Sequence, residues 1–346
     1  SYMRDVLYDR MTKIIGSPNN ISHSALCAEA EKFGPYYTEG YWGYRQYDVK
    51  NAHYILLWGA DPLAANRQVS YYSKVWGEAV DSATIAIVEP RLSATASKAD
   101  EWLPIKPGHD GALAVAIAHV LLTKGLWYKP FVGDFTDGQN RFVPNQIVNE
   151  ESFEEIYTHG IVKWWNYELK DKTPEWAAKI TGLDQTQIER VATGYGNAAP
   201  HAISWLGGGP CMQVRGGFAA MAVHALNGLV GAVDNVGGTQ ITNKEYTSKF
   251  PKPDPFMDEI AKKGKKNEKI DQRGRLELPA IKSGKPGSGV VTNNAADGIL
   301  NSDPYEIKVA IAYMNNFAFS APQPERWERA LAKIPFLTHI TTNASE

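Results

Sequence analysis

The sequence is poor in cysteine and nearly neutral in charge. Cys27 and Cys211 are the only cysteines among 346 residues, which excludes a disulfide framework and a metal site of the CxxC type. The formal net charge is −2, so charge gives no reason to expect binding to nucleic acid or to an anionic membrane. An anionic substrate would have to be attracted by a local group of basic residues.

Long apolar runs are also missing. The two longest candidates, residues 111–122 and 217–233, are interrupted by polar side chains, by His119 in the first and by His224 and Asn227 in the second. A membrane-spanning helix needs about 20 consecutive apolar residues, so none is predicted. Because the sequence opens inside a helical pattern and stops just after an apolar strand, we expect it to be the central fragment of a larger protein.

Two short runs rich in Ile, Leu and Val form the most informative local pattern. Residues 54–58 and 84–88 are typical of strands in a parallel sheet that helices cover on both faces. About thirty residues separate their turns, which is the length of one βαβ unit. Gly59 follows the first strand and Glu89 follows the second, an arrangement that favours nucleotide binding at these turns. The GxGxxG fingerprint of a nicotinamide enzyme does not occur there.

A second α/β pattern begins near residue 205. The strand at 201–206 runs into a glycine-rich turn and a helix of small residues, and a further strand is predicted at 307–314. We therefore predict an α/β fold of two doubly wound, Rossmann-like domains with mainly parallel sheets. The first domain would span residues 1–205, and the second, partial domain would span residues 206–346.

Helix start signals occur at three positions. Asp110 precedes a dense apolar stretch and is predicted to cap a buried helix. Thr173 and Asp184 each precede a short amphipathic pattern and are predicted to begin two further helices. These two lie within residues 126–185, an aromatic region that is predicted to form helices and loops.

Five segments carry a resemblance to a known family. They are LWGADP (57–62), EPRLSATASKADEWLPIKPGHDGAL (89–113), WLGGGPCMQVRGG (205–217), HALNGLVGAVDNVGG (224–238) and IKVAIAYMNNF (307–317). In this order and spacing, the sequence resembles the molybdopterin-dependent oxidoreductases related to dimethyl sulfoxide reductase and formate dehydrogenase. The resemblance implies a molybdenum (or tungsten) bis-molybdopterin guanine dinucleotide cofactor. It also implies a [4Fe-4S] cluster in a part of the protein outside this chain.

The same resemblance implies the cofactor-binding residues. The positions that match the family's cofactor contacts are Gly59, Asp61, Pro62, Glu89, Arg91, Lys106, Gly108, Asp110, Gly208, Gly209, Gln213 and Asn316. The acid at position 89 would hold a ribose or phosphate region, and Asp110 would face a guanine. Asn316 would lie beside the other nucleotide. Two positions depart from the usual family pattern, because Glu89 stands where Asp is usual and Asp61 stands where Asn is common.

Cys27 is the candidate metal ligand. A single cysteine is most often a small buried hydrophobic residue, which is how we interpret Cys211. Cys27 lies about thirty residues before the LWGADP strand, where the resemblance implies the protein ligand to the metal. A soft thiolate suits molybdenum, and a bound cation keeps the thiol deprotonated.

The residues around Cys27 are similar to the respiratory arsenate reductase branch of this family. By that similarity, a substrate oxyanion would be lined by His23, Ser24, Lys32, Tyr44 and, as a less secure candidate, Arg45. Lys32 would attract negative charge, His23 could deliver a proton, and Tyr44 could donate a hydrogen bond to an arsenate oxygen. The alternatives are that Lys32 is a solvated helix residue and that Tyr44 is a packed aromatic.

The expected function is molybdenum-dependent reduction of arsenate to arsenite in anaerobic respiration, by two-electron oxygen-atom transfer. Related enzymes that oxidise arsenite or reduce thiosulfate or polysulfide remain alternatives. A metal-free structural electron-transfer homologue is a further alternative, against which Cys27 and the glycine-rich turns argue. The resemblance also implies a periplasmic location and an iron–sulfur partner subunit.

Overall fold

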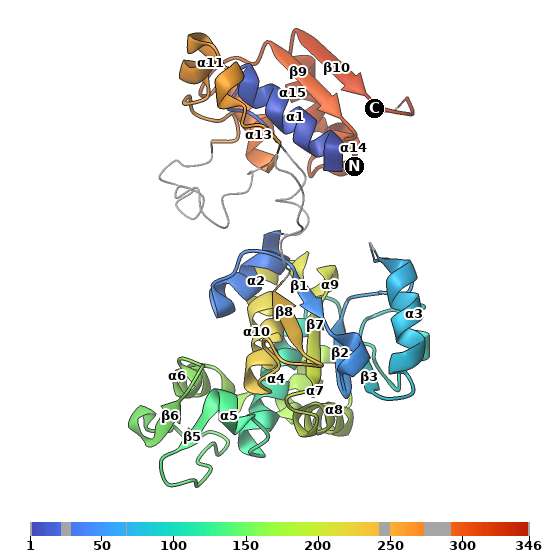
Figure 1. The fold of residues 1–346 in the computed structure, drawn as a ribbon, viewed down its shortest axis with the longest axis vertical. Helices are drawn as coiled ribbons and strands as arrows, with labels where there is room; N and C mark the ends of the chain where they lie inside the picture. Colours follow the sequence, from blue (N-terminus) through green and yellow to red (C-terminus); the bar gives the residue numbers. More distant parts are fainter. Residues whose placement is uncertain (1, 22–28, 67, 242–249, 273–291, 345–346) are drawn as a thin grey trace. The chain divides into compact units, whose positions relative to one another are not determined.

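A computed structural model describes residues 2–21, 29–66, 68–241, 250–272 and 292–344. The chain forms two compact units, a larger one of Ala30–Lys244 and a smaller one of Ser1–Glu29 with Glu245–Glu346 (Figure 1). This division differs from the predicted boundary at 205/206. The reason is that the strand ending at residue 206 pairs within the sheet of the larger unit, so the chain after it packs there too.

The larger unit is a mixed α/β structure. Its α-helices are α2 (Glu29–Glu39), α3 (Val69–Ala79), α4 (Asp110–Thr123), α5 (Lys129–Val132), α6 (Ile161–Tyr167), α7 (Pro174–Thr181), α8 (Gln185–Asn197), α9 (Gly208–Cys211) and α10 (Gly216–Leu229). Its strands are β1 (Arg45–Tyr47), β2 (Tyr54–Trp58), β3 (Thr84–Val88), β4 (Glu101–Leu103), β5 (Gly133–Phe135), β6 (Phe153–Glu155), β7 (Ala202–Leu206) and β8 (Thr239–Ile241).

A four-stranded parallel sheet forms the centre of this unit. Its strand order is β4-β3-β2-β7, and Leu56 in the middle of β2 lies opposite Ala86 on one side and Ser204 on the other. The predicted strands at 54–58 and 84–88 are confirmed with the same bounds. All five residues of β2 are buried, as expected for a strand covered on both faces.

Alternate residues of the sheet enter two separate cores. Leu56 and Trp58 belong to a core shared with α4, α8 and α10, whereas Ile55 and Leu57 belong to a core that includes Trp76 of α3. Figure 1 shows α3 on one side of the sheet and α4, α7, α8 and α10 on the other. The sheet is therefore doubly wound, and the α/β fold class is confirmed for this unit.

Two of the three predicted helix starts are confirmed. The Thr173 hydroxyl accepts a hydrogen bond from the Trp176 amide (3.2 Å) at the start of α7, and the Asp184 carboxylate accepts one from the Gln187 amide (3.0 Å) at the start of α8. The prediction for Asp110 is wrong. Asp110 is the first residue of α4, and His109 takes the N-cap position, because the chain turns into the helix one residue earlier.

The region 126–185 holds more than helices and loops. β5 and β6 form an antiparallel pair there, in which Phe135 lies opposite Phe153. Both rings pack edge to face at 5.0 Å, and Phe135 also packs against Phe142 at 5.0 Å. This aromatic cluster holds two strands that are too short to produce an alternating pattern in the sequence.

A set of buried hydrogen bonds joins α10 to the sheet. The Asn227 side chain accepts from the Ser204 amide (2.8 Å) and donates to the Ser204 carbonyl (2.9 Å). The Ser204 hydroxyl accepts from the Trp58 indole (3.0 Å) and donates to the Val223 carbonyl (2.9 Å). Asn227, Ser204 and Trp58 are all fully buried, so these bonds fix the position of α10 along β7.

The smaller unit has its own core and a second parallel pair. Its helices are α1 (Tyr2–Ile14), α11 (Glu259–Gly264), α13 (Thr292–Asn301), α14 (Phe317–Ser320) and α15 (Pro324–Ala332), and its strands are β9 (Val309–Tyr313) and β10 (Phe336–Ile340). β9 and β10 pair in parallel. Trp327 is buried at the centre and stacks on Phe317 with ring centroids 4.5 Å apart. Across the described part of both units, no helix is long and apolar enough to cross a membrane.

The Asn227 hydrogen bonds lead to a stability prediction. Asn227→Leu keeps a similar side-chain volume but leaves the buried amide and carbonyl of Ser204 without partners. We expect the free energy of unfolding to fall by about 2–4 kcal/mol. Urea unfolding followed by tryptophan fluorescence measures this loss.

Asn166→Leu is the matched control for this prediction. Asn166 makes the same two kinds of hydrogen bond to the amide (2.9 Å) and carbonyl (2.8 Å) of Val148, but it is only half-buried. Water can replace its bonds more easily, so a smaller loss is expected. Equal losses in the two variants would contradict the role assigned to Asn227.

Candidate functional site

The carboxyl edge of the sheet contains a topological switch point. From β2 the chain proceeds outward through β3 and β4, and it then returns to place β7 on the other side of β2. The turns that follow β2 and β7 therefore lie side by side. In doubly wound sheets, nucleotide ligands bind outside the strand ends at this point.

Glycines let these two turns touch through their backbones. Gly59 has φ +55°, and a Cβ atom on it would lie 2.8 Å from the Cα of Gly209. A Cβ on Gly207 would lie 2.6 Å from the Gly59 carbonyl oxygen. Gly208 differs, because a Cβ there would meet only the Met212 side chain at 3.9 Å. Gly59 and Gly207 are thus needed for contact between the turns, and Gly208 is the glycine with open space beside it.

Asp61 and Pro62 form the turn after β2. The Asp61 carboxylate accepts hydrogen bonds from the amide (3.2 Å) and hydroxyl (2.5 Å) of Thr95, and that hydroxyl accepts one from the Leu63 amide (3.2 Å). Pro62 is buried beneath this turn. Asp61 therefore ties the turn after β2 to the segment after β3, which gives it a structural role at the predicted cofactor edge.

Glu89 and Arg91 follow β3. The Glu89 side chain accepts a hydrogen bond from the Ser93 hydroxyl (2.7 Å), and its second oxygen lies 3.6 Å from the Arg91 guanidinium. Glu89 is nearly buried, whereas the Arg91 side chain is 76% exposed. The structure brings the two together at the strand end, with Arg91 as the side chain that reaches solvent.

The loop between β4 and α4 carries the predicted guanine-facing group. Asp110 is buried at the start of α4, and the Gln213 amide donates to its carboxylate (3.4 Å) and to the Gly209 carbonyl (2.9 Å). Burial raises the pKa of the Asp110 carboxyl above its ordinary value, although hydrogen bonds from its own backbone amide and from the Gln213 side chain oppose the effect. Gly108 has φ +87° next to Gln213, and Lys106 is exposed on the same loop. The structure thus brings Asp110, Gln213 and Gly209 together.

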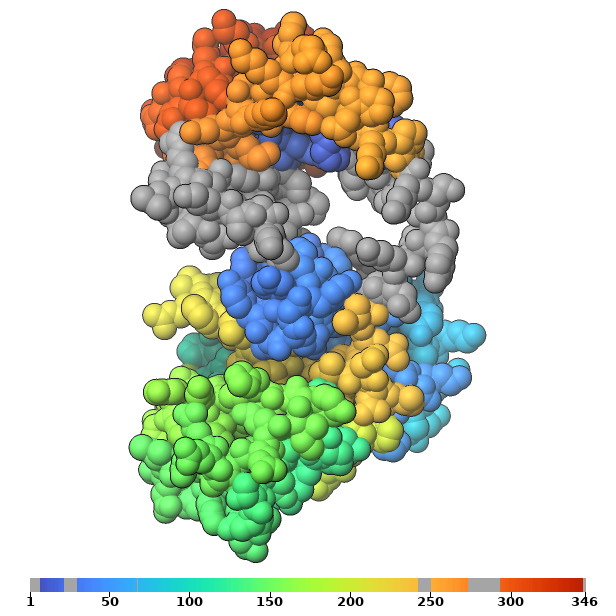
Figure 2. All heavy atoms as spheres, turned by 60° about the vertical axis from the view of Figure 1, so that its left-hand side comes forward, coloured from blue at the N-terminus to red at the C-terminus, as the bar shows by residue number. Residues whose placement is uncertain are grey.

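A large cavity extends from this edge along α10. Its volume is 1520 Å³, and its lining includes Gly108 and Gln213 at one end and Glu39 and His224 farther along. Helices α5 and α6 supply another part of its wall. Figure 2 shows the segment of these two helices (green) and the α2 segment (blue) on the same face of the larger unit. A cavity larger than the usual 300–1,000 Å³ of small-ligand pockets suits a long ligand.

These residues fit a pterin nucleotide. The switch-point glycines leave open space at Gly208, a buried carboxyl lies at the start of α4, and the adjoining cavity is long. A carboxylate can accept hydrogen bonds from the N–H groups of a guanine base, and backbone amides at a glycine turn can bind phosphate.

Lys32 and Tyr44 lie together. The Lys32 ammonium is 5.1 Å from the centre of the Tyr44 ring and 5.8 Å from that of Trp42. Lys32 lies on α2, and Tyr44 lies at the end of the loop that joins α2 to β1, with 39% of its surface exposed. The structure thus brings together two of the residues that were predicted to line an oxyanion pocket. The predicted residues His23, Ser24 and Cys27 lie outside the described part of the chain.

Arg45 takes a different position from the predicted one. Its side chain is only 2% exposed and forms an ion pair with Glu39, to which its Nε donates at 2.6 Å. Glu39 also bonds to the Nε2 atom of His224. Arg45 therefore contacts protein groups instead of lining an oxyanion pocket. The sequence contains a signal for this network, because His224 interrupts an otherwise apolar helix.

Cys211 agrees with its interpretation as a packed cysteine. It is buried, and its thiol donates to the Gly207 carbonyl (3.2 Å). Burial raises the pKa of this thiol, which opposes metal binding. Within the described residues, no group of three or more His, Cys, Asp or Glu side chains could hold a metal ion.

Asn316 lies in the smaller unit, at the carboxyl end of β9. Its side chain accepts a hydrogen bond from the Phe319 amide (3.1 Å) and so caps the short helix α14. A strand end next to a helix start is where a parallel α/β unit binds nucleotides, as the prediction for Asn316 requires.

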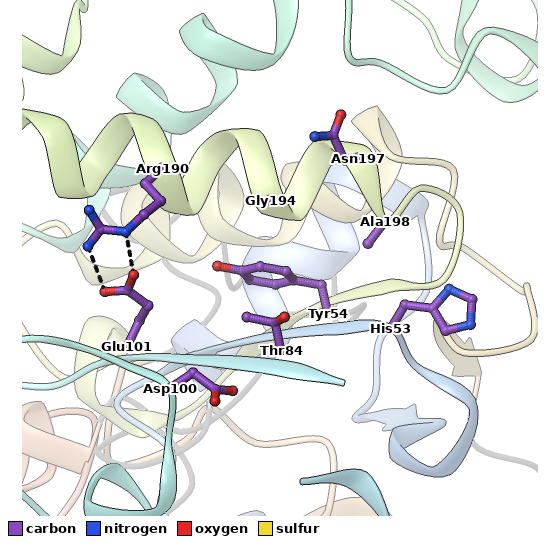
Figure 3. A pocket seen from close by; sticks show the side chains of 9 residues that line it. All are labelled: His53, Tyr54, Thr84, Asp100, Glu101, Arg190, Gly194, Asn197 and Ala198. Carbon is purple, nitrogen blue, oxygen red and sulfur yellow. Dashed lines mark hydrogen bonds and ion pairs between the residues drawn. The ribbon is translucent and has the colours of Figure 1, made fainter. Parts of the chain in front are cut away.

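A second cavity lies at the opposite edge of the large sheet. It has a volume of 480 Å³ and is lined by residues from the amino ends of β2 and β3 and from α8 (Figure 3). Arg190 donates from Nε (2.5 Å) and from its terminal nitrogen (3.0 Å) to Glu101 there. The hydrogen bond from Arg190 lowers the pKa of the Glu101 carboxyl. No motif in the sequence predicts this cavity, which lies away from the switch point.

Comparison with known proteins agrees with this geometry. The molybdopterin oxidoreductase family model matches residues 5–322. The chain is 57% identical over its whole length to the molybdopterin-containing subunit ArrA of the arsenate respiratory reductase of Shewanella sp. (strain ANA-3), of which it covers 41%. It is 56% identical, over 99% of its length, to the same subunit of Chrysiogenes arsenatis, of which it covers 40%. The chain therefore spans about two fifths of the length of these relatives.

More distant relatives share the fold. The thiosulfate reductase subunit PhsA of Salmonella typhimurium is 28% identical to the chain over 87% of the chain's length, and the match spans 36% of PhsA. The structure of acetylene hydratase from Pelobacter acetylenicus matches 95% of the chain with a TM-score of 0.70 and 19% identity, and 44% of it is covered. The family match over most of the chain, together with the switch-point geometry, leads to one conclusion: the chain belongs to the molybdopterin oxidoreductase family.

Proposed function

We propose that the full-length protein reduces arsenate to arsenite by two-electron oxygen-atom transfer in anaerobic respiration. The observation that carries this proposal is the 56–57% identity, along the whole chain, to subunits named for arsenate respiration. The adjacent Lys32 and Tyr44 side chains support it, because an ammonium and a phenol suit a tetrahedral oxyanion.

Family membership implies a molybdenum–pterin cofactor, and we infer the bis-guanine dinucleotide form of it. When bound, this group supplies the two-electron redox chemistry. Asp110 would hold a guanine base through its carboxylate, with Gln213 keeping that carboxylate in place. The turn at Gly208 would approach a pterin or phosphate, and Asn316 would serve the other nucleotide.

The chain's own residues would bind and orient the substrate. Lys32 would attract the anion, and Tyr44 would donate a hydrogen bond to one of its oxygens. His23 would deliver a proton to the oxygen that leaves, and Cys27 would bind the metal through its thiolate. Electrons would arrive from an iron–sulfur partner subunit through a [4Fe-4S] cluster of the full-length protein. A periplasmic location belongs to the same proposal.

A substrate test separates this function from its relatives. Purified full-length holoenzyme with a reduced viologen dye is expected to oxidise the dye when arsenate is added and to leave it reduced when thiosulfate or polysulfide is added. Dye bleaching measures both rates. Turnover with thiosulfate but not with arsenate would contradict the proposal, and a preparation without molybdenum or tungsten would favour a structural homologue.

The two cysteines give a matched pair for the metal ligand. Cys27→Ser is expected to abolish arsenate turnover and to change the electron paramagnetic resonance signal of the metal, because an alkoxide oxygen is a harder ligand than a thiolate. Cys211→Ser is the control, since a hydroxyl can keep the hydrogen bond to the Gly207 carbonyl. If Cys27→Ser kept the parent rate and signal, the ligand assignment would be wrong.

Asp110 allows the nucleotide site to be tested without turnover. Asp110→Asn replaces one of the two acceptor oxygens of the carboxylate by an NH2 donor, so the side chain can no longer accept a guanine N–H at each of its two terminal atoms. We expect guanine dinucleotide retention to fall by roughly tenfold, as loss of hydrogen bonds to a charged group predicts. The measurement is the GMP released by acid from purified protein. Asp184→Asn, at the start of α8, is the control, and equal GMP content in both variants would refute the guanine contact.

A further inference from the structure

Three side chains, of which only Arg45 was predicted to line the substrate site, form one buried network. Glu39 ends α2, Arg45 begins β1, and His224 lies on α10. Each oxygen of the Glu39 carboxylate has a different partner, Arg45 on one and His224 on the other. The side chains of Arg45 and His224 are 2% and 1% exposed, and that of Glu39 is 13% exposed. The network therefore joins three elements with almost no solvent.

Glu39 is charged within this network. Burial is the largest single influence and raises its pKa, but the hydrogen bond and charge of His224, followed by those of Arg45, outweigh it and hold the pKa below the ordinary value. A buried carboxylate with two such partners is costly to separate from either one. The ion pair thus holds the end of α2 close to the start of β1.

Arg45 also holds the loop between these elements. Its guanidinium donates to the carbonyl oxygens of Gly43 (3.0 Å) and Tyr41 (3.4 Å), and it lies 4.9 Å from the centre of the Tyr41 ring. The positions of two peptide groups and one ring of the loop at residues 40–44 therefore depend on the planar guanidinium group of Arg45. A lysine has no second nitrogen with which to repeat this geometry.

Tyr44 is the residue directly before Arg45. Neighbouring residues of an extended chain point to opposite sides, so burial of Arg45 presents Tyr44 outward, where it is 39% exposed. The same loop carries Trp42, whose ring packs edge-on against Phe33 of α2 at 5.2 Å. The Lys32 ammonium lies beside both Trp42 and Tyr44. The position of the pair Lys32–Tyr44 thus follows from the position of the loop.

His224 connects the network to the sheet. It lies one turn before Asn227, whose side chain is fixed to Ser204 of β7. The Nε2 atom of His224 bonds to Glu39, and its Nδ1 atom is buried without a hydrogen-bond partner among the described residues.

We propose that Glu39, Arg45 and His224 are positioning residues that set the loop at 40–44, and with it Tyr44 and Lys32, for an oxyanion substrate. This inference rests on the proposed function. None of the three side chains would touch the substrate. Their effect is to keep the phenol and the ammonium in a single arrangement before the anion arrives, which lowers the entropy lost on binding.

Kinetics of the full-length holoenzyme test the network. Glu39→Gln and Arg45→Lys are each expected to raise KM for arsenate by on the order of ten- to hundredfold, because a displacement of about 1 Å at a binding group has an effect of this size. In Arg45→Lys, whose parent side chain does not line the large cavity, the rate at saturating arsenate and the molybdenum content should stay within about twofold of the parent, since binding is perturbed more than chemistry. Tyr44→Phe gives the reference KM for loss of the Tyr44 hydroxyl itself.

Two further variants separate positioning from general stability. His224→Gln can still donate to Glu39 and is expected to keep a KM near that of the parent, whereas His224→Leu cannot donate and should resemble Glu39→Gln. Arg190→Lys is the matched control, because it removes a two-bond arginine–glutamate pair at the opposite edge of the sheet. An equal rise of KM in Arg190→Lys would overturn the proposal.

Hydrogen exchange provides a readout that does not depend on activity. Backbone amides of residues 41–44 should exchange faster in Glu39→Gln and Arg45→Lys, while amides of α8 stay unchanged. Faster exchange in a protein that does not turn over arsenate would support the network and refute the proposed function alone. If Glu39→Gln does not fold, the KM and the hydrogen exchange of Arg45→Lys decide the test, because that variant keeps the positive charge beside Glu39. Unchanged exchange and unchanged KM in Arg45→Lys would overturn the proposal.

Discussion

The hydrogen bonds between Asn227 and Ser204 are the constraint on which both parts of the site depend. They fix α10 along β7, with both partners fully buried. The amino end of α10 then lies next to the switch-point turn that carries Gly208, and its middle presents His224 to Glu39. One polar contact in an otherwise apolar layer thus determines where the cofactor edge and the substrate loop lie within the larger unit. A purely apolar helix face could slide along the sheet with little loss of burial.

Close packing at the switch point works with this constraint. Gly59 and Gly207 allow the turns after β2 and β7 to meet, at distances where a side chain on either one would collide with backbone. The acids that follow β2 and β3, Asp61 and Glu89, accept hydrogen bonds from neighbouring hydroxyl groups. Their geometry is therefore fixed before any ligand binds, which favours recognition by preformed groups.

The sequence predicted local features well and long-range ones poorly. The runs at 54–58 and 84–88 were found with the same bounds, and Thr173 and Asp184 cap helices as expected, because such signals lie within a few residues. The domain boundary depends on β7 pairing with β2, in which Trp58 bonds to Ser204 across 146 positions. The role of Arg45 depends on Glu39, whose other partner lies 185 positions away. No local pattern contains such contacts.

The Glu39 network gives a buried charged cluster a role beside the proposed anion site that needs no contact with the anion. A buried ion pair contributes little net stability, because the cost of removing both charges from water nearly cancels their attraction. The ion pair instead selects a single loop conformation. The Arg45 guanidinium can bond to Glu39 and to the two loop carbonyls at the same time only in that conformation. Apolar side chains in place of this network could fill the same volume, but the loop at 40–44 could then adopt several conformations of similar energy. Because Tyr44 immediately precedes Arg45, the conformation of the loop determines where the phenol of Tyr44 points.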